Sequence, residues 1–249
     1  MKSLDKVFRI IELLREDSGL GLKELSDKLD MNKSTTYRML SSLAKYNYIE
    51  KNYETKKYKL GIKFVEIGNQ VIQNMDIINI SKNYINELNS ITKETIHLAI
   101  LSKDKVVYID KRESLRPIRL YSQIGRNAPW HSTAVGKAIL AFQSKEFIKK
   151  TIESIDFYKY TDNTITNKED FLNELSKIEK QGYAIDREEH SKNVFCIAAP
   201  ICDHSARVIA SVSVTFIFDI ENLDKHLVKY KDLILKNSML ISQKLGYKN

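Results

Sequence analysis

Residues Leu22–Glu50 read LKELSDKLDMNKSTTYRMLSSLAKYNYIE and contain two short helical patterns separated by a tight break. In the first pattern the leucines recur at helical spacing, at Leu22, Leu25 and Leu29. The break is Asp30-Met31-Asn32. In the second pattern the apolar face restarts with Tyr37, Leu40 and Leu43. This arrangement predicts a helix-turn-helix, in which the second helix reads the major groove of DNA.

The second helix of this motif is expected to carry the DNA contacts. Asn32 or Ser34 can cap its first turn, because a short polar side chain can accept hydrogen bonds from the amides at a helix start. A recognition helix needs polar side chains that reach phosphates and base edges. The residues expected to do so are Lys33, Ser34, Thr35, Tyr37, Arg38 and Ser41.

A wing is predicted after the second helix. Tyr48-Ile49-Glu50 and Lys57–Leu60 look like two short strands around the polar turn 52–56. Lys56 and Lys57 lie at its tip, where they are expected to contact the phosphate backbone. The motif therefore extends to a winged helix-turn-helix.

The position of the charges supports a DNA-binding surface better than the net charge of +8 does. Residues 1–30 carry six Lys and Arg against seven Asp and Glu, a net charge of −1. Residues 31–60 carry seven against two, a net charge of +5. The positive charge thus begins where the predicted recognition helix begins. The alternative interpretation is a solvated basic face on an ordinary helical domain.

Composition places the chain among ordinary globular proteins. It has 249 residues, of which 43% are hydrophobic and 29% charged, which is enough for two domains. No stretch approaches the roughly 20 apolar residues of a membrane span, and the N-terminus has acidic residues inside its apolar run, unlike a secretory signal. We therefore expect a cytoplasmic protein. The cysteines, Cys196 and Cys202, lack the spacing of a zinc site and are expected to be reduced.

Three parts follow one another along the chain. Residues 1–61 are predicted to hold three helices and the wing, with Gly61 as its end. Apolar residues at helical spacing predict a linker helix over 62–80, with a further helix from about Ile80 to Ile91. Residues 81–249 are expected to form a second domain. The expected fold class is α/β of the α+β kind.

The second domain is predicted to be an antiparallel sheet flanked by helices. A hairpin is indicated by alternating residues at His97–Leu101 and Val106–Ile109. Further strands are expected at 118–121, 183–186, 195–201 and 207–218. The expected helices cover 132–143, 144–154, 168–181 and about 223–245.

Several segments, in order, resemble the IclR family of bacterial transcriptional regulators. They are KSLDKVFRIIELL, NKSTTYRMLSSL, KYKLG, IGRNAPWHSTAVGKAILA, YTDNTIT, QGYAIDREEH and VFCIAAPICDHSARVIASVSVT, which span nearly the whole chain. The resemblance implies a winged DNA-binding domain, a GAF-like domain that binds a small-molecule effector, and assembly as a dimer or a dimer of dimers. It also implies that the effector changes how the protein holds operator DNA.

The segment GRNAPWHSTAVGKA predicts one side of the effector pocket. Gly125 and Pro129 fix a loop, and Ser132–Val135 open a helix whose free amides would face a carboxylate. The resemblance implies backbone contacts from Ala134 and Val135, and side-chain contacts from Asp186, Cys196, Ser213 and Thr215. Leu120 and Trp130 are expected to form the apolar wall. Alternatively, Ser213 and Thr215 satisfy neighbours on a core strand.

Two chemical alternatives involve the same residues. Cys196, His131 and Asp186 could act as nucleophile, base and orienting acid, which would make the chain a cysteine-dependent hydrolase or transferase with a DNA-binding domain. No activated-nucleophile elbow is present, and the run Val194–Ala199 is apolar enough to hold an inert thiol. Scattered histidines could bind zinc, although no two lie four apart on one helix. Glu188-Glu189-His190 is interpreted as a solvated turn.

The sequence favours a ligand-responsive transcriptional regulator over both an enzyme and a purely architectural DNA binder. We expect a repressor of a catabolic operon that senses a small carboxylate, with sugar acids preferred because Asp186, Ser213 and Thr215 suit several hydroxyls. Its expected partners are operator DNA, the effector and a second copy of itself. No membrane contact, catalytic residue, cofactor or metal is expected.

Overall fold

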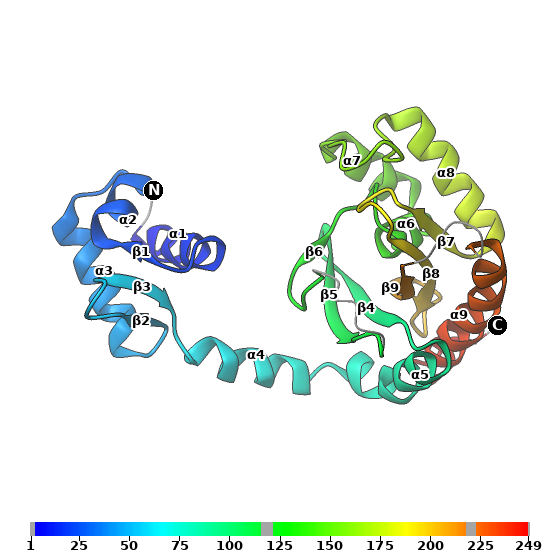
Figure 1. The fold of residues 1–249 in the computed structure, drawn as a ribbon, viewed down its shortest axis with the longest axis horizontal. Coiled ribbons are helices and arrows are strands. Elements are labelled where there is room, and N and C mark those ends of the chain that lie inside the picture. The colour runs from blue at the N-terminus through cyan, green and yellow to red at the C-terminus, as the bar shows by residue number, and fades with distance from the viewer. Residues whose placement is uncertain (1–2, 116–121, 218–222, 249) are drawn as a thin grey trace. The chain divides into compact units, whose positions relative to one another are not determined.

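The computed structural model describes residues 3–115, 122–217 and 223–248, which form two compact units, Met1–Met75 and Asp76–Asn249 (Figure 1). The joint between two helices marks the division. Helix α4 (Lys63–Gln73) ends at its C-cap Asn74, and α5 (Asp76–Thr92) starts with an acidic residue in its first turn. The sequence had placed this joint near residue 80. That prediction was wrong because apolar spacing continues through both helices.

The first unit is a winged helix-turn-helix, as predicted. It contains α1 (Ser3–Glu16), β1 (Leu20–Gly21), α2 (Leu22–Lys28), α3 (Lys33–Lys45), β2 (Ile49–Lys51) and β3 (Lys57–Leu60), followed by α4. The wing strands pair antiparallel, and β1 adds a third strand in the order β1-β3-β2. The sequence did not predict β1, since two residues show no alternation. The three helices and β3 share an apolar core that includes Ile10, Leu14, Leu25, Leu40 and Tyr58.

The second unit is built on a six-stranded antiparallel sheet in the order β6-β5-β4-β9-β8-β7. Its strands are β4 (Thr95–Ser102), β5 (Lys105–Arg112), β6 (Asn127–Ala128), β7 (Ala184–Arg187), β8 (Phe195–Cys202) and β9 (Val208–Phe216). Its helices, besides α5, are α6 (Ala134–Leu140), α7 (Lys145–Ser154), α8 (Lys168–Gln181) and α9 (Leu223–Lys244). The predicted mixture of antiparallel sheet and flanking helices is confirmed.

Helices cover both faces of this sheet. Helices α5 and α9 pack together on one face, whereas α6 lies against β8 and β9 on the other, with α8 packed on it (Figure 1). Strand β9 contributes side chains to both faces of the sheet, because successive side chains of a strand point to opposite faces. Phe216 meets Tyr230 of α9, with ring centroids 5.2 Å apart, while Ser213 and Thr215 point to the α6 side.

The predicted hairpin is present as β4 and β5, and α8 has the predicted bounds. Strand β6 was not predicted, again because it has two residues. Helix α6 is shorter than the predicted 132–143, because Thr133 is its N-cap and accepts from the amide of Gly136. The predicted strand at 118–121 lies outside the described residues.

Candidate DNA-binding surface and effector cavity

The start of α3 is fixed by a polar cap. Asn32 Oδ1 accepts from the amide of Thr35 at 2.8 Å and from the Ser34 hydroxyl at 2.9 Å, so Asn32 rather than Ser34 is the N-cap. Thr36, Leu40 and Leu43 are buried on the core side of the helix. The opposite side of α3 is exposed and can therefore contact DNA.

The residues predicted to contact DNA lie on that free side and on the wing. Thr35 is half-buried and the others are exposed, with Tyr37 51% exposed: Lys33, Ser34, Tyr37, Arg38, Ser41, Lys56 and Lys57. Within the described part of the chain, the four cations of this set form no ion pair. Lys59, by contrast, pairs with Glu50 at 2.9 Å. The unpaired cations are therefore the ones available to phosphates.

The wing turn holds its lysines in a defined conformation. The Asn52 side chain accepts from the amides of Glu54 and Thr55 at 2.9 and 3.0 Å. Lys56 follows with φ of 57°, a left-handed conformation that closes the turn. Lys56 therefore closes the wing turn, and Lys57 is the first residue of β3.

A cavity of about 600 Å³ opens in the second unit and brings six predicted effector residues together. They are Ala134, Val135, Asp186, Cys196, Ser213 and Thr215. Strand register explains this, since Asp186 pairs with Cys196 across β7 and β8, and Cys196 pairs with Thr215 across β8 and β9. The three side chains therefore form one row across the sheet, below the start of α6.

The start of α6 offers two free donors to this cavity. Thr133 Oγ1 caps the amide of Gly136, and the Lys137 amide bonds to the Thr133 carbonyl. Neither Ala134 nor Val135 donates its amide to an acceptor in the described residues. Both line the cavity, so a ligand carboxylate can accept from them.

The floor of the cavity is uncharged or only partly charged at neutral pH. Burial, and then the negative charge of Glu189, raises the pKa of Asp186 to about 7. Burial also raises the pKa of the Cys196 thiol well above its usual value, and that of the Tyr108 phenol. His97 is buried, which lowers its pKa to about 3. The floor therefore suits hydroxyl and carbonyl groups.

A buried ion pair supports the floor from behind. Lys137, which is fully buried on α6, donates to both carboxylate oxygens of Glu189 at 2.6 Å. The Glu189 amide donates to Asp186 Oδ1 at 2.7 Å. The interpretation of Glu188-Glu189-His190 as a solvated turn was thus wrong, because Glu189 is 7% exposed. A single lysine within the apolar helix AVGKAIL was the signal that a buried carboxylate must pair with it.

The two residues predicted to form the apolar wall are not among the described side chains that line the cavity. Trp130 is not among the side chains that line the cavity. Its ring packs edge-on against Phe147, with centroids 6.3 Å apart, and belongs to the core between α6 and α7. The wall prediction was wrong for Trp130 because side chains near a loop can turn to either side of it. Leu120 lies outside the described residues.

Sequence reasoning missed several side chains of the cavity. They are His97, Tyr108, Ser122, Arg126, His190 and Lys192. A signal existed for His97, since a lone polar residue faced the same side as Ala99 in the apolar strand HLAIL. Ser122, Arg126 and Lys192 stand in loops, where no periodicity points to a face.

The geometry around Cys196 does not support the enzymatic alternative. Its Sγ donates to Thr215 Oγ1 at 3.2 Å, and His131 Nε2 instead bonds the Tyr158 carbonyl at 3.1 Å. The raised pKa keeps the thiol protonated. Within the described residues the thiol has no imidazole partner, so it lacks the activation of a nucleophile.

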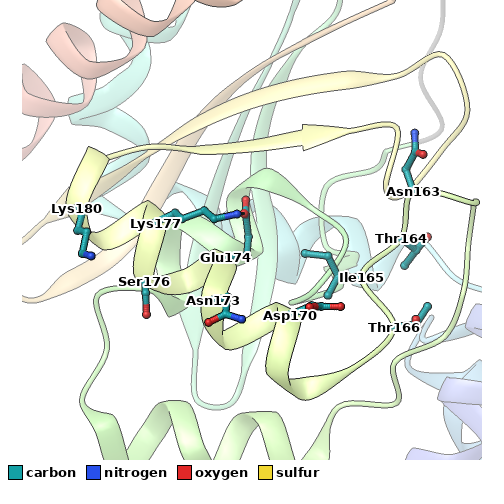
Figure 2. A pocket seen from close by; sticks show the side chains of 10 residues that line it. All are labelled: Asn163, Thr164, Ile165, Thr166, Asp170, Asn173, Glu174, Ser176, Lys177 and Lys180. Carbon is teal, nitrogen blue, oxygen red and sulfur yellow. Dashed lines mark ion pairs between the residues drawn. The ribbon is translucent and has the colours of Figure 1, made fainter.

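A second concavity of about 720 Å³ runs along α8 and the loop before it (Figure 2). Its lining is polar and includes Asp170, Glu174, Lys177 and Lys180. Glu174 pairs with Lys177 at 3.8 Å, and none of the predicted effector residues lies in this groove. The predicted effector residues that the structure describes therefore gather at the cavity between the sheet and α6 and not at this groove.

Comparison with known proteins decides the family. Residues 3–52 match the profile of the IclR helix-turn-helix domain, and residues 69–242 match that of the "Bacterial transcriptional regulator IclR C-terminal". The chain belongs to the IclR family. The resemblance noted in the sequence is thereby confirmed for both parts of the molecule.

Individual IclR relatives align over almost the full length. The HTH-type transcriptional regulator KdgR of Escherichia coli (strain K12) is 37% identical, over 99% of this chain and 94% of its own. The crystal structure of the Thermotoga maritima IclR is 31% identical, with a TM-score of 0.78 and 98% of both chains covered. An IclR homologue from Microbacterium hydrocarbonoxydans, complexed with 4-hydroxybenzoate, shares the fold at 16% identity, with a TM-score of 0.82, over 98% of this chain and 99% of its own.

This IclR-family chain is a ligand-responsive, DNA-binding transcriptional regulator. The family and the related chains are named as transcriptional regulators, not as enzymes. None of the described helices is long and apolar enough to cross a membrane.

Proposed function

We propose that this regulator is a repressor of a catabolic operon, and that a small carboxylate, with sugar acids preferred, binds the cavity and changes its hold on operator DNA. The observation that carries the proposal is the cavity itself. Two free amides, Ala134 and Val135, stand opposite a row of polar side chains that are uncharged or only partly charged at neutral pH. One end suits a carboxylate and the other suits hydroxyls.

Two considerations favour sugar acids among small carboxylates. The polar row of Asp186, Cys196 and Thr215 can exchange several hydrogen bonds with hydroxyls, and a site built for hydrogen bonds rejects ligands that lack them. The homologue with 4-hydroxybenzoate indicates only that the fold can hold a carboxylate. A purely aromatic acid would leave the polar row unpaired.

DNA contact is assigned to α3 and the wing. Lys33, Arg38, Lys56 and Lys57 are exposed and unpaired in the described chain. Arg38 is proposed to reach a base edge, since its planar fork suits guanine, and the lysines are proposed to contact phosphates. Ser34, Thr35, Tyr37 and Ser41 complete the set.

The regulator is proposed to act as a dimer or a dimer of dimers. Helix α4 has no buried residue, and it exposes four apolar side chains, Val65, Ile67, Val71 and Ile72, which are 37–54% exposed. Such a face is costly in water and suits a second copy of the same helix. A dimer would also set the spacing of two recognition helices.

The test is a thermal-shift screen of the full chain against sugar acids, keto acids and aromatic acids, joined to DNA binding. Operator DNA is first selected from a random duplex pool. A hit is expected to raise the melting temperature and release the DNA, and to do neither in Asp186→Asn and Ser213→Ala. Ser205→Ala, on the turn before β9, serves as the control. If a ligand still shifts the melting temperature of the cavity variants, the effector does not bind in this cavity. If a ligand strengthens DNA binding, the protein is not a repressor that its effector releases from DNA.

A further inference from the structure

A chain of four hydrogen-bonded side chains crosses the cavity wall. Cys196 Sγ donates to Thr215 Oγ1 at 3.2 Å, and Thr215 Oγ1 lies 3.2 Å from His97 Nδ1. On the other side of the ring, His97 Nε2 lies 2.7 Å from Ser122 Oγ. All four side chains line the cavity. Strands β8, β9 and β4 and the loop after β5 are thereby joined through one imidazole.

The direction of these bonds follows from the protons available. Thr215 accepts from the thiol, so its own hydroxyl proton is free to go to His97 Nδ1. A neutral imidazole that accepts at Nδ1 must carry its proton on Nε2 and donate it to Ser122. Ser122 then keeps its own hydroxyl proton for a group in the cavity. The imidazole therefore fixes which oxygens of the wall accept and which donate.

We propose that His97 determines effector specificity: as a neutral imidazole with its proton on Nε2, it orients Thr215 and Ser122 so that this wall of the cavity binds uncharged hydroxyl or carbonyl groups. The inference rests on the effector cavity of the proposed function. His97 is a positioning residue, since it acts through the two hydroxyls.

The surroundings keep the imidazole neutral and still. His97 is 3% exposed, and the Tyr108 ring packs on it with centroids 5.0 Å apart. Burial, and then the positive charge of Lys111, lowers the pKa of His97 to about 3. Lys111 also donates to the Ser122 carbonyl at 2.8 Å, which holds Ser122 from its backbone side. Ser122 is thus fixed at two atoms.

This arrangement defines the chemistry that the wall accepts. A ligand hydroxyl can donate to Thr215 Oγ1 and accept from Ser122 Oγ, whereas an apolar chain would leave both unpaired. The cations that line the cavity, Arg126 and Lys192, lie in loops and are not among the four linked residues, so a second carboxylate at this wall would meet Asp186 and the protonated thiol of Cys196. The wall therefore selects the oxygenated, uncharged end of an acid.

The first test needs no ligand. Histidine labelled with ¹⁵N and ¹³C in the full chain reports the tautomer and charge of each imidazole by NMR, and His97→Gln assigns the His97 signals. The expected result is a neutral ring with the proton on Nε2, unchanged between pH 8 and pH 5. Titration of His97 in that range, or a proton on Nδ1, would overturn the inference.

The second test compares ligands that differ only in hydroxyls. The dissociation constants of D-gluconate and of hexanoate, which has the same chain length, are measured for the wild type, His97→Phe and Ser122→Ala. Each substitution is expected to raise the dissociation constant of D-gluconate by about tenfold or more, and to change that of hexanoate by no more than about twofold. His97→Gln, which keeps an acceptor and a donor, is expected to recover part of the loss.

Equal losses for both acids would mean that His97 only supports the fold, and the inference would fall. If the wild type binds neither these acids nor any other member of the carboxylate panel, the proposed function fails instead. The NMR experiment then still decides whether His97 is held as described, because it does not depend on an effector.

Discussion

Asp186 lies between the cavity and the buried ion pair of Lys137 and Glu189. Its protonation should therefore change the free energy of unfolding of the second unit. Its pKa of about 7 lies above the ordinary value of 3.8. Between these values the folded chain binds more protons than the unfolded chain. The free energy of unfolding contributed by Asp186 is therefore fully present below about pH 4 and is lost as the pH rises through 7.

Asp186→Asn should remove this dependence, since the amide keeps an oxygen for the Glu189 amide but carries no charge. Relative to the wild type, the variant is expected to become more stable as the pH rises from 5 to 8. Urea unfolding of both proteins across this range measures the difference in their free energies of unfolding. Because both proteins contain the buried His97, its contribution cancels in this difference. Parallel stability profiles for the two proteins would contradict the raised pKa.

Lys137 and Glu189 should behave as a unit. Lys137→Met leaves the Glu189 carboxylate buried without its cation, and we expect a loss of about 3–5 kcal/mol in the free energy of unfolding. The double variant Lys137→Met/Glu189→Leu should lose less than the sum of the two single changes. Urea unfolding of the four proteins gives this comparison.

Lys177→Met is the matched control, because Lys177 also pairs with a glutamate but its side chain is 71% exposed. Its melting temperature is expected to stay close to that of the wild type. Strict additivity in the double variant would show that Lys137 and Glu189 contribute separately, contrary to the geometry.

At the residue scale, the sequence predicted the cavity better than its supports. Asp186, Cys196, Ser213 and Thr215 could be placed because the family resemblance fixes them and strand register brings them together. Glu189 could not, since its partner Lys137 is 52 positions away and only the fold joins them. The lone lysine in the apolar helix α6 indicates that a buried carboxylate is needed, but only the fold shows that Glu189 supplies it.

At the scale of elements, α3 and the wing are expected to contribute differently to DNA binding. Arg38→Ala should cost about 1–3 kcal/mol on the selected operator and relax the preference at one base pair, if the guanidinium meets a base edge. Binding to a set of operators with single base changes measures this. A uniform loss over all sequences would make Arg38 a phosphate contact.

Lys57→Ala on the wing is expected to leave the preferred site unchanged and to reduce the slope of log affinity against log salt by about one. Fluorescence anisotropy with labelled operator at several salt concentrations gives this slope. Lys59→Ala is the control, because Lys59 already pairs with Glu50 and should release fewer counterions. An unchanged slope for Lys57→Ala would remove the wing tip from the interface.

The elements themselves were predictable where the pattern was long. Helix α8 shows apolar spacing at Phe171, Leu175 and Ile178 and ends at Gly182, whose φ of 82° suits a helix end, and its bounds agree with prediction. The break at residues 74–75 was not predictable, because apolar residues continue on either side. Strands of two residues, β1 and β6, carry no period at all.

At the scale of the whole molecule, the proposed assembly should depend on α4. The mass of one chain is 28.9 kDa, and light scattering after gel filtration is expected to give twice or four times that value. The double variant Val71→Glu/Ile72→Glu should lower the mass and weaken operator binding, because carboxylates on this face oppose burial. Gln70→Glu on the same helix is the control. A monomeric wild type would contradict the proposal.

The two-sided character of β9 has a consequence for how such a sensor evolves. Its even positions, from Val212 to Phe216, pack toward α9, whereas Ser213 and Thr215 line the cavity. Mutations at the cavity positions can therefore accumulate without disturbing the hydrophobic layer that holds the strand. Substitutions at these two positions of one strand could thus adapt the protein as a biosensor for other metabolites, while the residues that pack the strand against α9 stay unchanged.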